Sequence, residues 1–430
     1  DDYRAPLQDA TRPVFIYANG AKNIGVKGQG EINGNARRVY DDLRKVDYFI
    51  EDITENARNA GVEMKQYYVV PPDVAMFIFY NCQDITMEGV SLVESSFWTL
   101  HMIRCQRILI QNMSIYSSLE KGVNADGIDM NSCRDVTIKN CKITTGDDAI
   151  VLKTRYDEPC ENIRVSNCVL SSSSTALKLG TESFGDFRNI RFENCKVLNS
   201  NRGLSIVVRD GGTVENVTFS NISIECKRRH FNWWGNGDPI WIYLTKKYPE
   251  KSKAGYIKDI VFENISANGM GTSRIESTEG MRIENIQLIN VNIEMYQEDY
   301  PDKRADHAIY ASSVNGLILK NCKVTWDEEN TEEKWGSALY ISRCSEVVVE
   351  NFLGRQGLID SDIPAIILSN TSNVSIENFV SDPFTKTVVA VNGPESKDIT
   401  LINIQQLRND QKRLSVNSEV IEKQSIQLIR

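Results

Sequence analysis

A unit of about 27 residues recurs down most of the chain, and this repeat limits the possible folds more than any other feature. The unit reads x-x-I-x-h-x-N-h-x-h, where h is apolar, and its asparagine recurs at Asn112, Asn140, Asn167, Asn194, Asn221, Asn264, Asn290, Asn321, Asn351, Asn378 and Asn403. A unit this short cannot bury its own apolar face, so neighbouring units must stack. The 430 residues would otherwise suggest two or three ordinary domains. The repeat favours one elongated domain instead.

Each unit alternates apolar and polar residues with period two, and the alternation breaks at the asparagine. This pattern predicts two short strands joined by a turn. Asparagine suits the turn because it tolerates a left-handed backbone, and its amide can form a ladder with the asparagine one coil above. The repeated leucine framework of leucine-rich repeats is absent. We therefore predict an all-β fold, a single-stranded parallel β-helix (solenoid) of roughly ten to thirteen coils spaced about 4.8 Å apart.

Two segments interrupt the repeat, and we interpret both as insertions into a single domain that spans residues 1–430. The first, near 35–72, has charged and apolar residues at near-helical spacing, which suggests a short helix or an excursion beside the first coils. The second, near 226–257, places several aromatic residues among basic ones. Long insertions in a solenoid lie on one face and commonly shape a binding site.

Composition excludes several classes of protein. The net charge of -9 argues against nucleic-acid binding. No uncharged apolar run reaches the length of a membrane-spanning helix. No signal peptide is recognisable, and because the chain starts at Asp1 rather than Met, an earlier leader stays open.

The ten cysteines fall mostly into two columns of the repeat and never form a CxxC pair. One column elsewhere holds apolar residues, so we interpret the cysteines as reduced, buried packing residues rather than as disulfides or metal ligands. The three histidines lie far apart in sequence and make no metal signature.

Acidic residues gather on the strand that precedes the asparagine unit. Asp126-Gly-Ile-Asp-Met aligns with Asp148-Ala-Ile-Val-Leu one coil later. The third and fifth residues point inward, so the first and fourth face outward. This alignment superposes Asp126 on Asp148, with Asp147 beside them and Asp129 on the same solvent-facing strand.

Clustered carboxylates repel one another, which raises at least one pKa. A glycosidase needs such a pair, one carboxyl protonated and one ionised. A calcium site and an accidental surface cluster remain alternatives.

The residues around these acids read Asn124-Ala-Asp126-Gly-Ile-Asp129 and Thr145-Gly-Asp147-Asp148-Ala-Ile-Val-Leu-Lys153. They resemble the NTDGxD and GDDxxxxK signatures of glycoside hydrolase family 28, the polygalacturonases and rhamnogalacturonases. The likeness is most specific from about residue 80 to residue 225.

The resemblance implies a right-handed parallel β-helix that hydrolyses pectic α-glycosidic linkages with inversion, without metal or organic cofactor. It makes Asp147 the general acid, and Asp126 with Asp148 the pair that activates water. Inversion further implies that Asp147 points away from the other two, which leaves room for the water.

The chain departs from the family pattern at two places. Ser174-Thr175-Ala176 stands where the family usually has Gly-His-Gly, and Ser205-Ile206-Val207 stands where it usually has Arg-Ile-Lys. Substrate recognition has therefore changed, and the candidates for substrate contact are Asn124, Asp129, Lys178, Arg202, Arg209, Trp233 and Trp234. Each cation could equally be a solvated surface charge. The tryptophans could close one end of a groove, which would favour release of terminal sugars, or simply anchor the insertion.

Our leading hypothesis is an inverting glycoside hydrolase that acts on a pectin-like, galacturonate-containing or related polysaccharide or oligosaccharide. A β-helical polysaccharide lyase or epimerase with calcium and a Lys or Arg base is an alternative, and Lys178 keeps it open. A non-catalytic carbohydrate-binding solenoid is another. We expect a monomer that binds no nucleic acid and does not span a membrane, and a polymeric substrate implies a periplasmic or secreted enzyme.

Overall fold

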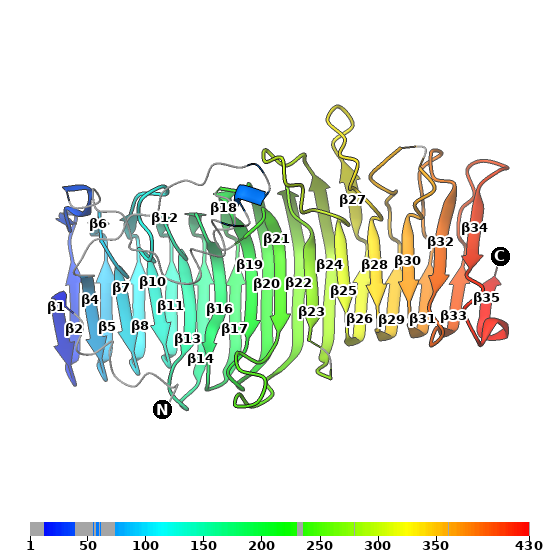
Figure 1. The fold of residues 1–430 in the computed structure, drawn as a ribbon. Coiled ribbons are helices and arrows are strands. Elements are labelled where there is room, and N and C mark those ends of the chain that lie inside the picture. The colour runs from blue at the N-terminus through cyan, green and yellow to red at the C-terminus, as the bar shows by residue number, and fades with distance from the viewer. Residues whose placement is uncertain are drawn as a thin grey trace.

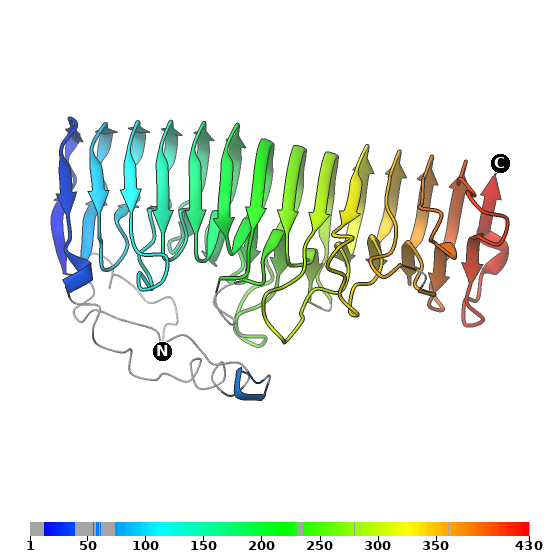
Figure 2. The same cartoon turned by 90° about the horizontal axis from the view of Figure 1, so that it is seen from above.

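The computed structural model describes residues 13–38, 55, 57–59, 61, 74–229, 235–278, 280–359 and 361–429. They form a long right-handed parallel β-helix whose coils follow one another from the N-terminal to the C-terminal end (Figure 1; Figure 2). About 13 turns are present, and the predicted fold class is confirmed.

One sheet has a strand from each coil, in the order β1 (Val14–Asn19), β4 (Ala75–Tyr80), β7 (Leu100–Ile103), β10 (Ile128–Asn131), β13 (Ile150–Thr154), β16 (Thr175–Ser183), β19 (Arg202–Val208), β21 (Asp238–Leu244), β23 (Ser273–Ser277), β25 (Ile309–Ser312), β28 (Leu339–Ser342), β30 (Ile366–Ser369), β32 (Thr387–Asn392) and β34 (Lys412–Val416). Its 14 strands pair in parallel. We call it the first sheet.

The other 21 strands form the second sheet: β2 (Lys22–Lys27), β3 (Glu31–Asn33), β5 (Gln83–Glu88), β6 (Ser91–Val93), β8 (Gln106–Gln111), β9 (Ser114–Tyr116), β11 (Arg134–Lys139), β12 (Lys142–Thr145), β14 (Cys160–Ser166), β15 (Val169–Ser172), β17 (Phe187–Glu193), β18 (Lys196–Ser200), β20 (Thr213–Cys226), β22 (Tyr256–Gly269), β24 (Ile283–Met295), β26 (Val314–Lys320), β27 (Lys323–Trp326), β29 (Ser345–Glu350), β31 (Ser372–Glu377), β33 (Lys397–Ile402) and β35 (Ile426–Ile429). Two short 3-10 helices are also present, η1 (Ala36–Arg38) and η2 (Lys423–Ser425), and residues 55 and 57–59 are helical.

The repeated asparagine makes the turn that the sequence predicts. All eleven asparagines of the repeat have φ between 50° and 56°. Their side chains also form the expected ladder: the Asn290 amide donates to Asn264 Oδ1 at 2.9 Å, and Asn403 donates to Asn378 at 2.7 Å. A second, unforeseen ladder runs parallel to it, in which Asn216 donates to Asn189 at 2.6 Å. Its signal was the recurrent Asn or Asp directly before the first apolar residue of each unit.

Replacing Asn221 with Ala should lower the free energy of unfolding by about 1–2 kcal/mol, because Ala tolerates left-handed backbone poorly. Asn221 has φ 54° and links Asn194 and Asn264 through bonds of 3.2 and 3.0 Å. Chemical denaturation measures the loss. Asn221→Gly, which removes the amide but permits the backbone, should lose less. An Ala variant as stable as the parent would contradict this account of the turn.

Apolar side chains fill the inside of the coils. Phe192, Phe219 and Phe262 stack on successive coils, with ring centroids 4.8 and 5.0 Å apart. All ten cysteines are buried and free, which confirms that they are packing residues.

The second predicted insertion belongs partly to the solenoid. Strand β21 lies within 226–257, yet it pairs in parallel with β19 and β23. Among the described residues of this range, those outside strands are 227–229, 235–237 and 245–255. Most of the first insertion, 35–72, lies outside the described residues. In the part of the chain that the structure describes, we find no helix that could cross a membrane.

Candidate active site

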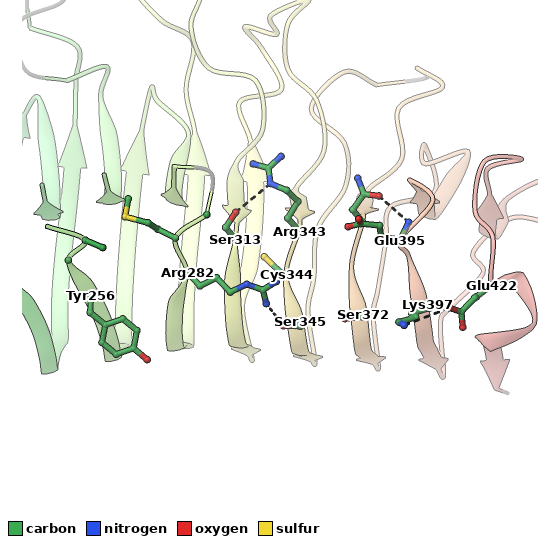
Figure 3. A pocket seen from close by; sticks show the side chains of 15 residues that line it. Tyr256, Arg282, Ser313, Arg343, Cys344, Ser345, Ser372, Glu395, Lys397 and Glu422 are labelled. Atoms are coloured by element: carbon green, nitrogen blue, oxygen red, sulfur yellow. Dashed lines mark hydrogen bonds and ion pairs between the residues drawn. The ribbon is translucent and has the colours of Figure 1, made fainter. Parts of the chain in front are cut away.

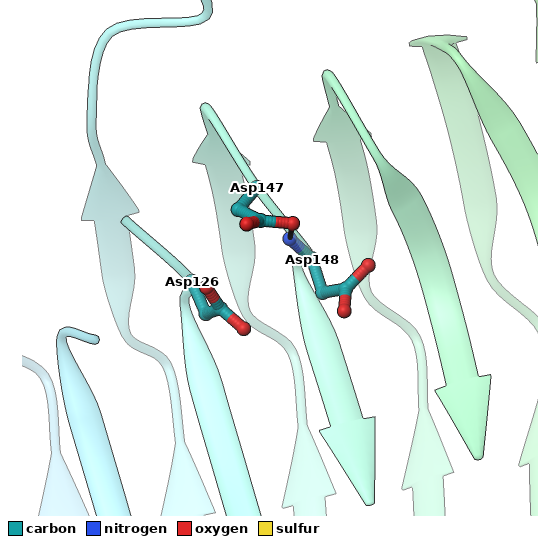
Figure 4. A group of neighbouring side chains, drawn as sticks. All are labelled: Asp126, Asp147 and Asp148. Carbon is teal, nitrogen blue, oxygen red and sulfur yellow. Dashed lines mark hydrogen bonds between the residues drawn. The ribbon is translucent and has the colours of Figure 1, made fainter. Parts of the chain in front are cut away.

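The register of the first sheet brings the predicted acids together. Ile128 of β10 pairs with Ile150 of β13, so Asp126 and Asp148 hold equivalent positions on adjacent coils. Asp147 precedes Asp148 in the turn that leads into β13. One carboxylate oxygen from each of the three residues lies within 4.8 Å of the other two (Figure 4).

Two expectations about this cluster are wrong. The carboxylates were expected on a solvent-facing surface, but Asp126, Asp147 and Asp148 are only 2%, 6% and 3% exposed. Asp147 was also expected to point somewhat away from Asp126 and Asp148, whereas one carboxylate oxygen of each residue lies within 4.8 Å of the other two. The site is thus a covered polar cluster, and its groups interact more strongly than they would in water.

Asp148 is held by donors on both of its carboxylate oxygens. Lys178 Nζ donates to Oδ2 at 2.7 Å, while the Ser174 hydroxyl and the Thr175 backbone N–H donate to Oδ1 at 2.7 and 3.1 Å. Charge-assisted hydrogen bonds of this kind stabilise the ionised carboxylate. Ser174 therefore supports Asp148 at the segment where the family's usual histidine is missing.

Lys153 forms ion pairs with two acids of the motif, Asp126 and Asp129. Its ammonium lies 3.2 Å from Asp126 Oδ2, 2.7 Å from Asp129 Oδ1 and 3.5 Å from the centroid of the Trp98 ring. Burial lowers the pKa of Lys153, but the surrounding carboxylates outweigh it and raise the pKa well above its usual value. Asp129 is fully buried. Its expected place on the substrate-contact surface is therefore wrong, and its role here is to position Lys153.

Asp147 is the best candidate for a proton donor. Burial, followed by repulsion from Asp126 and Asp148, raises the pKa of Asp147 well above its usual value. Asn124 donates its amide N–H to Asp147 Oδ2 at 3.4 Å, so this predicted residue lies beside the acid. Burial also raises the pKa of Asp126 to about 6 against the pull of Lys153, and Asp126 Oδ1 has no hydrogen-bond partner among the residues that the structure describes.

We expect thermal stability to fall as the pH rises from about 4.5 to 7, because Asp126 has a folded-state pKa of about 6 and an ordinary unfolded-state value. A carboxyl whose pKa is higher in the folded than in the unfolded protein stabilises the fold. This stabilisation is complete below the unfolded-state pKa, and it is lost as the pH rises through the folded-state pKa. Each pKa unit corresponds to about 1.4 kcal/mol. Melting curves across this range measure the slope, and Asp126→Asn should flatten it. A parent whose melting temperature rises over this range would contradict the assignment.

The remaining candidates have mixed outcomes. Lys178 lies at the site but pairs with Asp148. Arg202 donates to Asp238 Oδ2 at 2.9 Å and lies over the Trp241 ring, two coils from Asp148. Arg209 lies near Asp210, 3.8 Å from its Oδ2. Trp233 and Trp234 lie outside the described residues.

Sequence reasoning missed the groups that surround the acids. Trp98 and Lys153 stood in the aligned segments without a role, although Trp98 occupies the same stacked position as Asp126 and Asp148. At the family's Arg-Ile-Lys positions stand Ser205 and Val207, which carry no charge that could pair with a uronate carboxylate. Geometrically, the three acids could hold a divalent cation. The ammonium groups of Lys153 and Lys178 already neutralise part of their charge.

A surface groove elsewhere on the molecule lacks such a cluster among its lining residues. It has a volume of about 900 Å³ (Figure 3). Arg343 donates to the Ser312 and Ser313 hydroxyls, and Lys397 lies 3.7 Å from Glu422. The buried acids remain the candidate site, because Asp147, with a raised pKa, lies beside Asp148, which is paired with Lys178.

The chain is similar to proteins named as polygalacturonases and exopolygalacturonases. A probable polygalacturonase of Vitis vinifera is 35% identical over 75 residues, 17% of this chain and 15% of the relative. A probable exopolygalacturonase B of Neosartorya fischeri is 24% identical over 148 residues, 33% of this chain and 29% of the relative. These alignments thus span less than a third of the relatives' lengths.

Among solved structures, the exopolygalacturonase of Thermotoga maritima has a TM-score of 0.54 at 23% identity, covering 72% of this chain and 71% of that one. The family 28 exopolygalacturonase of Yersinia enterocolitica has a TM-score of 0.52 at 14% identity, covering 77% and 60%. Both likenesses concern the fold. The family model described as glycosyl hydrolases family 28 matches residues 7–305, and the chain belongs to that family.

Proposed function

We propose that this protein is an inverting, exo-acting glycoside hydrolase of galacturonate-containing polysaccharides or oligosaccharides. The observation that carries the proposal is the contrast between neighbouring acids. The pKa of Asp147 is raised well above its usual value, whereas Asp148 pairs with Lys178 at 2.7 Å. The substrate class rests on family membership and on relatives named as polygalacturonases and exopolygalacturonases.

In the proposed reaction, Asp147 gives its proton to the glycosidic oxygen as the bond to the anomeric carbon breaks. Asp126, with Asp148, accepts a proton from a water molecule whose oxygen forms the new bond. Asp148 is a poor nucleophile because donors occupy both its oxygens. We therefore favour direct attack by water although the carboxyls lie closer together than the roughly 6.5–9.5 Å common in inverting enzymes.

A lyase or epimerase reaction is less well supported, because it needs a neutral Lys or a comparable base. The candidate Lys178 lies 2.7 Å from the Asp148 carboxylate. The carboxylates beside Lys153 raise its pKa. An ion pair thus occupies Lys178 Nζ, and the neighbouring carboxylates keep Lys153 charged.

Exo action is supported by a row of outward positions on the first sheet, which we call the outer row: Ile78, His101, Asp129, Val151, Lys178, Ser205, Trp241, Arg274, Tyr310, Tyr340 and Ile367. Its first four members are at most 1% exposed. Trp98 lies over Lys153 on this N-terminal side. Lys178 and most later members are partly exposed. Within the described residues, the outer row is thus open on the C-terminal side of the acids, and we infer that a polymer extends in that direction.

The test is to incubate the protein with oligogalacturonides and follow the first product by proton NMR and chromatography. We expect a single small sugar whose anomeric configuration is opposite to that of the bond cleaved, with activity unchanged by excess chelator. A product of retained configuration would reject inversion. A ladder of product lengths would reject exo action, and chelator-sensitive formation of unsaturated products absorbing ultraviolet light would identify a lyase.

A polymeric substrate also places the proposed enzyme outside the cytoplasm, in a periplasm or secreted. All three acids come from one chain, so the proposed site needs no second copy, and we infer a monomer without a metal or cofactor.

A further inference from the structure

The outer row changes character on the C-terminal side of the acids. Trp241, Arg274, Tyr310 and Tyr340 follow one another on β21, β23, β25 and β28, and all four are partly exposed. Tyr310 and Tyr340 contact each other, with ring centroids 5.5 Å apart. Buried solenoid cores use such ladders for packing, but these rings face outward. They are an aromatic surface on the same face as Asp126 and Asp148.

Two local arrangements hold these side chains in place. Arg274 Nη2 donates to both Asp306 oxygens, at 2.9 and 3.0 Å, and its guanidinium carbon lies 5.2 Å from the Tyr310 ring centroid. His307 lies 4.8 Å from the Tyr340 ring. Its Nδ1 accepts a hydrogen bond from the Ser337 backbone N–H at 3.0 Å. Burial lowers the pKa of His307 despite the nearby Asp306, so the imidazole is neutral. The surface is therefore rigid, and its cation is neutralised by Asp306.

The spacing of this surface matches a sugar polymer. Tyr310 and Tyr340 lie five and six coils beyond β13, which is about 24 and 29 Å from Asp148 at about 4.8 Å per coil. A pyranose unit in a chain is of similar length to one coil. The face of a sugar ring is largely C–H, while its edge carries hydroxyls, and tyrosine offers the same combination of an apolar body and a polar tip.

We propose that Arg274, Tyr310 and Tyr340 form a distal platform that binds sugar units four to six coils from the point of cleavage. The proposal rests on the proposed function, because it takes galacturonate oligomers as the ligand. Because of this platform, the affinity for an oligomer should keep rising with chain length after all the sugar units that contact the acids are present. Because Asp306 neutralises Arg274, the added affinity comes mainly from ring contact and varies little with salt.

The experiment uses the full chain with Asp147→Asn, which blocks turnover, and measures Kd by calorimetry for oligogalacturonides of two to eight units. In this background Kd should fall further as the ligand grows from four units to seven. Adding Tyr310→Ala and Tyr340→Ala should weaken binding of the longest ligands about two- to tenfold per ring. Binding of the dimer and trimer should stay unchanged. Tyr340→Phe keeps the ring and should bind like the background.

Tyr116→Ala is the matched control, since this tyrosine is 45% exposed on β9 of the second sheet. Circular dichroism confirms that each variant is folded, and the phenylalanine variant reports on the ring if an alanine variant fails to fold. If Kd depends on ligand length in the Tyr310→Ala and Tyr340→Ala variants as it does in the background, the platform is wrong. The proposed function would still stand in that case, provided that short oligomers bind and the parent hydrolyses them. Failure of the Asp147→Asn protein to bind any oligogalacturonide, together with no hydrolysis by the parent, would overturn both the platform and the proposed substrate.

Discussion

Replacing Asp147 with Asn should lower kcat on oligogalacturonides by about 10²–10⁴-fold, the usual contribution of a general acid. The variant keeps the shape of the side chain but cannot give a proton to the leaving oxygen. Burial and the negative charges of Asp126 and Asp148 keep the parent carboxyl protonated. The amide therefore resembles the neutral form already present, and folding should be preserved. Initial rates and melting curves on the same preparation measure both effects.

Measuring substrate affinity distinguishes a catalytic role of Asp147 from a role in carbohydrate binding alone. We expect Asp147→Asn to keep the parent's Kd for short oligomers. Asp135→Asn is a suitable control, because Asp135 is an exposed acid on β11 of the second sheet and should leave kcat unchanged. Equal kcat for Asp147→Asn and the parent would show that Asp147 is not the proton donor.

Replacing Lys178 with Met should lower kcat by roughly 10²-fold and move the acidic limb of the pH profile to higher pH. Lys178 Nζ lies 2.7 Å from Asp148 Oδ2, and the Lys178 side chain is only 12% exposed. Removing one partner of a buried ion pair costs about 3–5 kcal/mol, because the other charge loses its compensation. Lys178 also holds down the pKa of Asp126. Without it, Asp126 takes up a proton at higher pH and stops activating water.

Lys178→Arg keeps the charge and should recover part of kcat and most of the pH profile. The profile distinguishes this positioning role from the substrate contact that the sequence suggested for Lys178. A residue that only binds substrate would raise KM and leave the acidic limb in place. That result for Lys178→Met would contradict the ion pair as the source of the effect.

The sequence was sufficient to place the backbone of the site. In a parallel solenoid, the alignment of repeats is the register of strands, so matching Asp126 to Asp148 predicted their contact. The turn conformation at Asn221 also followed, because the same residue type recurred wherever a left-handed backbone was needed.

The side chains around the acids were less predictable. Alignment gives the direction of a Cα–Cβ bond, but it does not say how far a long side chain reaches or what covers it. Lys153 extends to Asp126 one coil before, and Trp98 lies over its ammonium. These contacts turned an expected solvent-facing cluster into a buried one. The separation of the carboxyls was also misjudged, because rotamers rather than register determine it.

Because the solenoid consists of coils stacked one on another, its architecture predicts where heating unfolds it first. Each coil contacts only the coils before and after it, so thermal damage should fray inward from the two tips. The coils with Asp126 and Asp148 are fourth and fifth in the first sheet, whereas β25 and β28 are tenth and eleventh of 14. Fraying from the C-terminal tip would thus reach Tyr340 before the acids. Fraying from the N-terminal tip would reach Asp126 after the same number of coils, three, so the tip that melts first decides whether cleavage or the preference for long chains is lost first.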